Sequence, residues 1–241
     1  FLKDRIVLQY IGLEDASILL HREEESWNYQ FLADYFAAPP SVKKNSGINL
    51  DLKKVTLKNI RFAKKDGWRG EDIQIGIKGL ELAARQLDPA NKKVLINSIA
   101  VQEPFFSLYD YPGNRPPRVL TSQDTASLPA VAASWNLGGW QLLIDRLTIQ
   151  NGVFKTDKQH DREPYHYFDG QHILFSEINS RMHHIRLEGD TLTAAISLST
   201  KERSGLRVKS FGANLKWDPQ NMDFRDLDIL TNRSHLRNHF K

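Results

Sequence analysis

The chain has 241 residues, with 33 Lys and Arg against 29 Asp and Glu, which gives a formal net charge of +4. A charge this small disfavours nucleic acid as a partner, and the absence of cysteine excludes disulfides, thiolate catalysis and cysteine-type zinc sites. No apolar run approaches the roughly 18 residues of a membrane span. Because the chain starts at Phe1 and a strand pattern follows almost at once, we read it as a segment of a longer protein, in which any signal peptide or anchor lies elsewhere.

Residues 1–22 are predicted to be extended, whereas the segment Trp27–Phe36 changes to helical spacing. Its aromatic residues recur every three or four positions, Ser26 is a suitable N-cap, and Pro39 prevents continuation. A helix this short is stable only when it packs on another element. We expect it to cover the sheet, and the alternative is a place on a membrane surface.

Further along the chain, Ile73–Leu82 alternates between apolar and polar residues, which predicts a half-buried strand. The stretch Pro112–Pro129 holds four of the ten prolines and is predicted to be a long loop. Ala130–Trp135 is a candidate for one helical turn. Strand patterns then continue, with Lys201–Gly205 as a hairpin turn, so nearly the whole chain is predicted to be β.

One apolar pattern occurs four times. Counted from its first residue, apolar side chains fall at offsets 0, 3, 5 and 10, and a polar residue falls at offset 7. The copies span residues 8–18, 52–62, 96–106 and 144–154, and a partial fifth copy spans 224–234. The first residues of the four copies lie 44, 44 and 48 positions apart. A period of this length is typical of arrays whose units bury apolar faces against their neighbours, so we expect residues 1–241 to form one elongated unit.

Two features inside each copy predict bends. A polar pair at offsets 1 and 2, such as Asp145-Arg146, shifts the alternation by one residue, which a β-bulge accommodates. The phase shifts again between offsets 5 and 10, and offset 8 is Pro104 in one copy and Gly152 in another. The pair Asn151-Gly152 also fits a tight hairpin turn, and the spacing does not choose between the two.

The predicted fold is therefore mainly β, an elongated and curved antiparallel sheet with one or two short amphipathic helices. In an open groove of this shape, apolar residues form continuous rows along the concave face. The candidate lining residues are Ile11, Leu13, Val55, Leu57, Ile73, Ile75, Ile77, Ile99, Val101, Leu147 and Ile149. Taken alone, the spacing favours a filled hydrophobic core over an open groove.

Catalytic and metal-binding patterns are weak in this sequence. His160, His166 and His172 are spaced six apart, but metal ligands are usually closer, and the residues between them are irregular. The adjacent His183-His184 pair is expected at the surface. No phosphate-binding loop, nucleophile elbow or metalloprotease helix is present, so we expect no enzyme, no cofactor and no metal.

The order of several motifs resembles a known family. These motifs are Trp27-Asn28-Tyr29-Gln30-Phe31, the fourth copy 144–154, the run Lys201–Gly205, and Leu227–Thr231 followed by Ser234. Together they resemble the AsmA-like and TamB proteins of Gram-negative envelopes, over essentially the whole chain. The resemblance implies a parent protein anchored in the inner membrane and spanning the periplasm as a taco-shaped sheet. Its apolar interior would conduct phospholipid between the inner and outer membranes, and an outer-membrane barrel protein is an implied partner.

The resemblance favours the groove over the filled core, and two other functions stay open. The first is a scaffold that pairs its β edges with outer-membrane proteins during their assembly. The second is a carbohydrate-binding β domain, which requires Trp68, Trp135, Trp140 and Trp217 to gather on one exposed face. The long loop Pro112–Pro129 departs from a regular groove, and leaves open whether the segment conducts lipid or caps a channel.

Overall fold

The computed structural model describes residues 6–31, 48–49, 52–116, 134–159 and 162–241, and these are almost entirely β. The strands are β1 (Ile6–Val7), β2 (Tyr10–Glu14), β3 (Ser17–Arg22), β4 (Ile48–Asn49), β5 (Lys54–Asp66), β6 (Glu71–Asp88), β7 (Lys93–Gln102), β8 (Phe105–Asp110), β9 (Gln141–Lys158), β10 (His172–Glu188), β11 (Thr191–Glu202), β12 (Arg207–Trp217), β13 (Met222–Thr231) and β14 (His235–Phe240). The mainly β prediction is confirmed. No helix in these ranges is long and apolar enough to cross a membrane.

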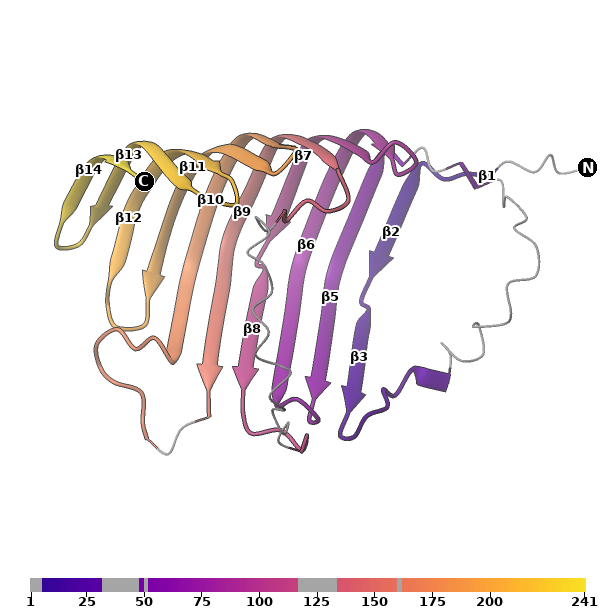
Figure 1. The fold of residues 1–241 in the computed structure, drawn as a ribbon, viewed down its shortest axis with the longest axis horizontal. Helices are drawn as coiled ribbons and strands as arrows, with labels where there is room; N and C mark the ends of the chain where they lie inside the picture. Colours follow the sequence, from indigo (N-terminus) through magenta and orange to yellow (C-terminus); the bar gives the residue numbers. More distant parts are fainter. Residues whose placement is uncertain (1–5, 32–47, 50–51, 117–133, 160–161) are drawn as a thin grey trace, which may run out of the picture.

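Twelve strands form one curved sheet, while β1 and β4 pair separately. The main order is β14-β13-β12-β11-β10-β9-β7-β6-β5-β2, with β3 extending β2 along β5 and β8 extending β7 between β6 and β9. Figure 1 shows these strands side by side, from β2 and β3 at one edge to β14 at the other, curling over at one end.

The prediction of a purely antiparallel sheet is wrong, because the sheet is mixed. The strands β2 and β3 run parallel to β5, and β7 and β8 run parallel to β9. A parallel neighbour requires a long connection that returns the chain to the same end of the sheet. Residues 23–53 and 111–140 make these two connections, whereas the antiparallel neighbours are joined by short turns, except for the longer loop 159–171 between β9 and β10.

The predicted helices fall largely outside the described residues. Gln30 and Phe31 are helical, and the rest of the predicted helix Trp27–Phe36 lies in the range 32–47. Of Ala130–Trp135, only residues 134 and 135 are described, and neither is helical. The expected loop Pro112–Pro129 is described up to residue 116, without a strand. The hairpin turn at Lys201–Gly205 joins β11 to β12, as predicted.

The repeat copies lie side by side in register. Copy 1 pairs with copy 2, so that Ile11 lies opposite Val55 and Leu13 opposite Leu57. Copy 3 pairs with copy 4 in the same way, with Ile99 opposite Leu147. The parallel register therefore places residues of equal offset next to each other. As a result, the apolar residues of neighbouring copies form rows across the sheet.

The copies carry irregularities at two offsets. At offset 7, Asp15, Asn59, Glu103 and Asn151 all have a positive φ, between 46° and 53°. Asp and Asn tolerate this left-handed conformation better than most residues. Because β9 runs unbroken from Gln141 to Lys158, the pair Asn151-Gly152 is a bend within a strand and not a hairpin turn.

The second irregularity lies at offset 1, where the predicted β-bulge is present. The pairing of β6 with β7 steps from Ala83–Ser98 to Ala84–Ile96, which leaves Asn97 as the extra residue. On the polar face, the Arg85 guanidinium donates to the side chains of Asn97, at 3.2 Å, and of Asp145, at the equivalent place in copy 4. One cation therefore links the bulge of copy 3 to the equivalent position of copy 4.

A substitution at Asn151 tests the left-handed bend. We expect Asn151→Val to lower the free energy of unfolding by about 1–2 kcal/mol, because a β-branched residue fits a positive φ poorly. Asn151→Gly, the matched control, is expected to be neutral or slightly stabilising, since glycine adopts this conformation freely. Urea unfolding of the two variants gives the comparison. Equal stabilities would contradict the role assigned to the bend.

Candidate functional site

The two bends bring every apolar offset of the repeat to one face of the sheet. Each bulge shifts the alternation of side chains by one residue, so offsets 0, 3, 5 and 10 share a face. On β9, Ile144 and Leu147 lie three residues apart, yet both contribute to the same apolar cluster. The polar residues between them, Asp145 and Arg146, bracket the bulge.

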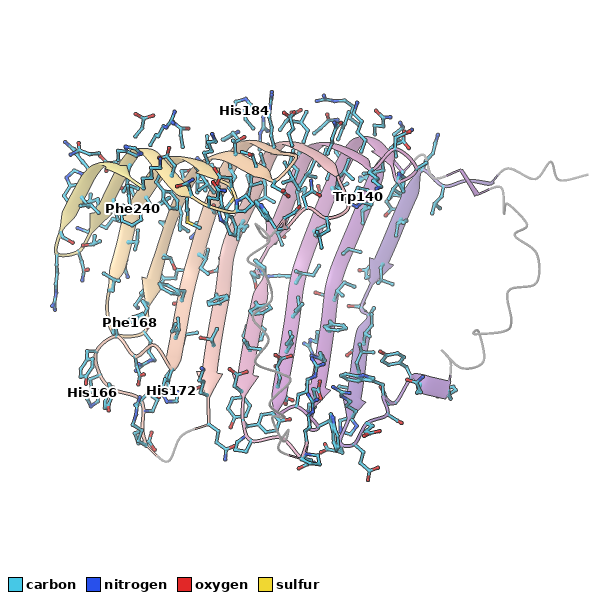
Figure 2. The ribbon with its side chains drawn as sticks, viewed as in Figure 1. Trp140, His166, Phe168, His172, His184 and Phe240 are labelled. Atoms are coloured by element: carbon cyan, nitrogen blue, oxygen red, sulfur yellow. The ribbon has the colours of Figure 1, made fainter. Side chains whose placement is uncertain are left out.

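This apolar face is the concave side of the sheet. Ile96, Ile144, Ile185 and Ala194 form its most buried cluster, at 6–8% exposure. They come from four neighbouring strands of one sheet, and side chains within a bend converge, whereas those outside it diverge. His184 of β10 lies at this level of the sheet on the polar face. Figure 2 shows it pointing outward from the top of the bend.

The predicted rows are present, and β6 connects them. At offset 3, Leu82 lies between Val55 and Ile99. At offset 5, Leu80 lies between Leu57 and Val101. The full rows in register are Ile11–Val55–Leu82–Ile99–Leu147–Met182–Ile196 and Leu13–Leu57–Leu80–Val101–Ile149–Ser180–Leu198–Phe211–Ile229–Leu236.

The three isoleucine candidates on β6 lie elsewhere than in these two rows. Ile75 lies between Phe62 and Phe106, Ile77 opposite Ile60, and Ile73 opposite Leu108. Leu80 and Leu82, which were not among the candidates, therefore complete these two rows. The alternation of Ile73, Ile75 and Ile77 does not predict them, because the two leucines lie an odd number of residues further along β6.

A further row at offset 10 is rich in aromatic residues. In register it runs Ile18–Phe62–Ile75–Phe106–Phe154–Phe175. The rings of Phe106 and Phe154 stack with centroids 5.6 Å apart and planes 7° apart. Of this row only Ile75 was among the candidates, although offset 10 of the repeat marks Ile18, Phe62, Phe106 and Phe154.

Exposure of the apolar face differs along the strands. At offset 0, Leu52, Ile96 and Ile144 are buried and Leu8, at the edge of the sheet, is 38% exposed. The rows at offsets 3 and 5 are half-buried in the middle of the sheet, and at offset 10 Phe62 and Phe106 are half-buried and Phe154 is 37% exposed. A sheet normally buries its apolar face under a second layer. Among the described residues no such layer covers the aromatic row. In the described part of the chain the apolar face is therefore most buried at the bend and partly exposed beyond it, as expected for an open groove.

Ion pairs occupy the end of the sheet away from the bend. Asp66, fully buried, accepts hydrogen bonds from Arg22 Nε and Nη2 at 2.7 and 2.8 Å and from the Arg69 backbone N–H at 3.0 Å. Asp169, 4% exposed, accepts two from Arg162, at 2.7 and 3.1 Å. In both cases hydrogen bonding from the arginine holds the pKa of the aspartate below its ordinary value.

The histidines and tryptophans do not form the sites considered for them. His172 binds Asp157 through Nδ1, His166 lies in the preceding loop (Figure 2), and His160 lies outside the described residues. Trp135 packs against Trp217 with ring centroids 4.7 Å apart. Trp68 lies in the turn after β5, at the opposite end of the sheet from Trp140, which precedes β9. A carbohydrate site would require the four tryptophans to gather in one place, and they do not.

The polar face has shallow hollows. Two of them have volumes of about 580 and 560 Å³. Polar and charged side chains line much of both, among them Asn59 and Lys78 in the first and Arg181 and Lys209 in the second. Neither resembles an enclosed catalytic pocket, and the apolar face is the more extensive candidate surface.

Comparison of the chain with protein-family models, with curated proteins and with solved structures gives no match. The apolar face is therefore interpreted from its own residues.

The Arg22–Asp66 pair predicts a pH dependence of stability. The pKa of Asp66 in the folded protein lies below the unfolded value of about 3.9. The contribution of Asp66 to the free energy of unfolding is therefore complete at pH values above the unfolded pKa and is lost as the pH falls through the folded pKa. We expect Asp66→Asn to cost on the order of 3 kcal/mol at pH 7, because it leaves a largely buried arginine without its partner. The deficit is expected to shrink towards pH 2.

The control is Asp228→Asn, which removes the partner of the exposed Arg237 and is expected to cost at most about 1 kcal/mol. Urea unfolding at both pH values measures these differences. A deficit of Asp66→Asn that is the same at pH 2 and pH 7 would contradict the assignment.

Proposed function

We propose that the chain binds the acyl chains of phospholipid in its concave apolar face and conducts lipid along the groove. The observation that carries the proposal is the set of apolar rows, which run in register across the sheet and stay partly exposed beyond the bend. Extended apolar surfaces of this kind on a folded protein are typical of interaction sites.

The physical basis of binding is burial of the acyl chain. Each methylene transferred from water to the groove contributes roughly 0.8 kcal/mol. The half-buried leucine, isoleucine and valine rows offer contact along the acyl chain, and the partly exposed aromatic row offers flat surfaces at the open side. A headgroup stays in water at that open side, where its charge needs no desolvation.

Movement along the groove follows from the repetition. Equal offsets of successive copies present similar apolar residues, such as Leu57, Val101 and Ile149, so neighbouring sites have similar affinity for an acyl chain. A lipid can then move from one site to the next, because no single site binds it much more tightly than its neighbours. No residue performs chemistry in this mechanism, which is passive.

The envelope setting rests on the resemblance to AsmA-like and TamB proteins. In that setting the chain acts in the periplasm, its parent protein is anchored in the inner membrane by parts outside these residues, and phospholipid moves between the two membranes. The curved sheet with in-register repeats supports this proposal through its shape. A scaffold for an outer-membrane barrel protein is the alternative for the parent protein.

Lipid content after detergent-free purification tests the proposal. Organic extraction and mass spectrometry are expected to find phospholipid in at least stoichiometric amount. Two substitutions, Ile75→Asp in the aromatic row and Val101→Asp in the offset-5 row, are expected to reduce the amount of bound phospholipid several-fold. The reason is that burying a carboxylate against an acyl chain is unfavourable.

The matched controls place the same charge on the neighbouring residues of the polar face, Gln74→Asp and Ala100→Asp, and are expected to retain the lipid. Circular dichroism checks that all four variants stay folded. Folded wild-type protein without lipid, or equal loss of lipid from both faces, would overturn the proposal.

A further inference from the structure

The two edges of the sheet differ in how open they are. At one edge, β14 has an irregular backbone, with a φ of 117° at Asn238, and carries His235, Arg237 and His239. Charges and irregularities of this kind protect an edge from pairing with another strand. At the other edge, β2 and β3 expose the apolar residues Ile11, Leu13 and Ile18 to 37%, 44% and 46%.

The backbone of β2 is free on one side. The Asp15 N–H donates to Lys58 O at 2.9 Å, so in β2 the odd-numbered residues direct their backbone groups towards β5. The N–H and C=O groups of Tyr10, Gly12 and Glu14 point the other way. Within the described ranges, β2 pairs with no strand except β5.

The lower part of this edge is already closed. Asn28 Oδ1 accepts from the His21 backbone N–H at 3.0 Å, and Asn28 Nδ2 donates to Leu19 O at 3.0 Å. The Asn28 N–H also donates to His21 O, at 2.8 Å. The side chain of Asn28 therefore takes the place of a neighbouring strand along β3, and the free edge is limited to the region of β2.

The internal order of the sheet indicates which strand fits this edge. From the edge inward, copy 1 and copy 2 are followed by the reversed strand β6, and then copy 3 and copy 4 are followed by the reversed strand β10. The neighbour of copy 3 on its outer side is β6, which places Leu80 opposite Val101 and Leu82 opposite Ile99. The corresponding neighbour of copy 1 is the vacant position beyond β2.

We propose that the β2 edge binds an antiparallel β-strand of a partner polypeptide, with apolar residues at alternate positions. The partner's backbone pairs with Tyr10, Gly12 and Glu14. Its apolar residues lie opposite Ile11 and Leu13, as Leu82 and Leu80 lie opposite Ile99 and Val101 in copy 3, and they lengthen the apolar rows by one strand. The inference goes beyond lipid binding and does not depend on it.

Disulfide trapping tests the register, because the chain has no cysteine of its own. The probe is a peptide with the sequence of residues 78–88, the part of β6 that pairs with copy 3. Opposite residues in a non-hydrogen-bonded antiparallel pair have Cα atoms about 4.5 Å apart, within the range of a disulfide. We expect the Leu13→Cys protein to cross-link with a Leu80→Cys peptide at least tenfold faster than with a Glu81→Cys peptide.

A proline on the free side of the edge provides the second variant. Glu14→Pro removes an N–H that points away from β5, so the protein is expected to stay folded and to keep its lipid, while the cross-link to the Leu80→Cys peptide is lost. Equal cross-linking of the two peptides, or none with folded protein, would overturn the proposal. Dimerisation through β2 without peptide would overturn it as well, since it would assign the edge to a second copy of this chain.

Discussion

The structure depends on a left-handed residue that recurs at offset 7 in every copy of the repeat and on a β-bulge at offset 1, seen in copy 3. A strand that alternates regularly places only every second residue on one face. The bulge at offset 1 and the left-handed residue at offset 7 each shift that alternation. They collect offsets 0, 3, 5 and 10 on the concave side and curve the strand at the same time. The apolar rows and the curvature of the sheet therefore have one cause.

Parallel pairing of the copies converts this local property into a surface. Because copies 1 and 2, and copies 3 and 4, pair with equal offsets adjacent, their bends form continuous lines across the sheet. Side chains converge where the bend is sharpest, and Ile96 and Ile144 are buried in one cluster by residues of neighbouring strands of the same sheet. Beyond the bend the same face opens towards the exposed Phe154. This gradient from closed to open gives the groove an apolar interior and an accessible side.

The repeat predicted the β class, the bulge at the polar pair Asn97-Ser98 and the rows through Val55 and Val101. It did not predict the direction of pairing, because that depends on the path of residues 23–53 and 111–140, which apolar spacing does not encode. Leu80 and Leu82 were missed because β6 lies outside the repeat, and its register follows from hydrogen bonding with β5 and β7. The buried Arg22–Asp66 pair joins residues far apart in sequence and leaves no local pattern.

The central claim is that acyl chains occupy the concave face, and fluorescence quenching in a cysteine-free background tests it most directly. A fluorophore is attached to Leu57→Cys, Val101→Cys or Ile149→Cys in the offset-5 row, and to Thr148→Cys on the polar face. Phospholipid carrying a nitroxide on its acyl chain is then added. The account predicts strong quenching at the three row positions and little at position 148. Equal quenching at all four positions, or none in folded protein, would contradict it.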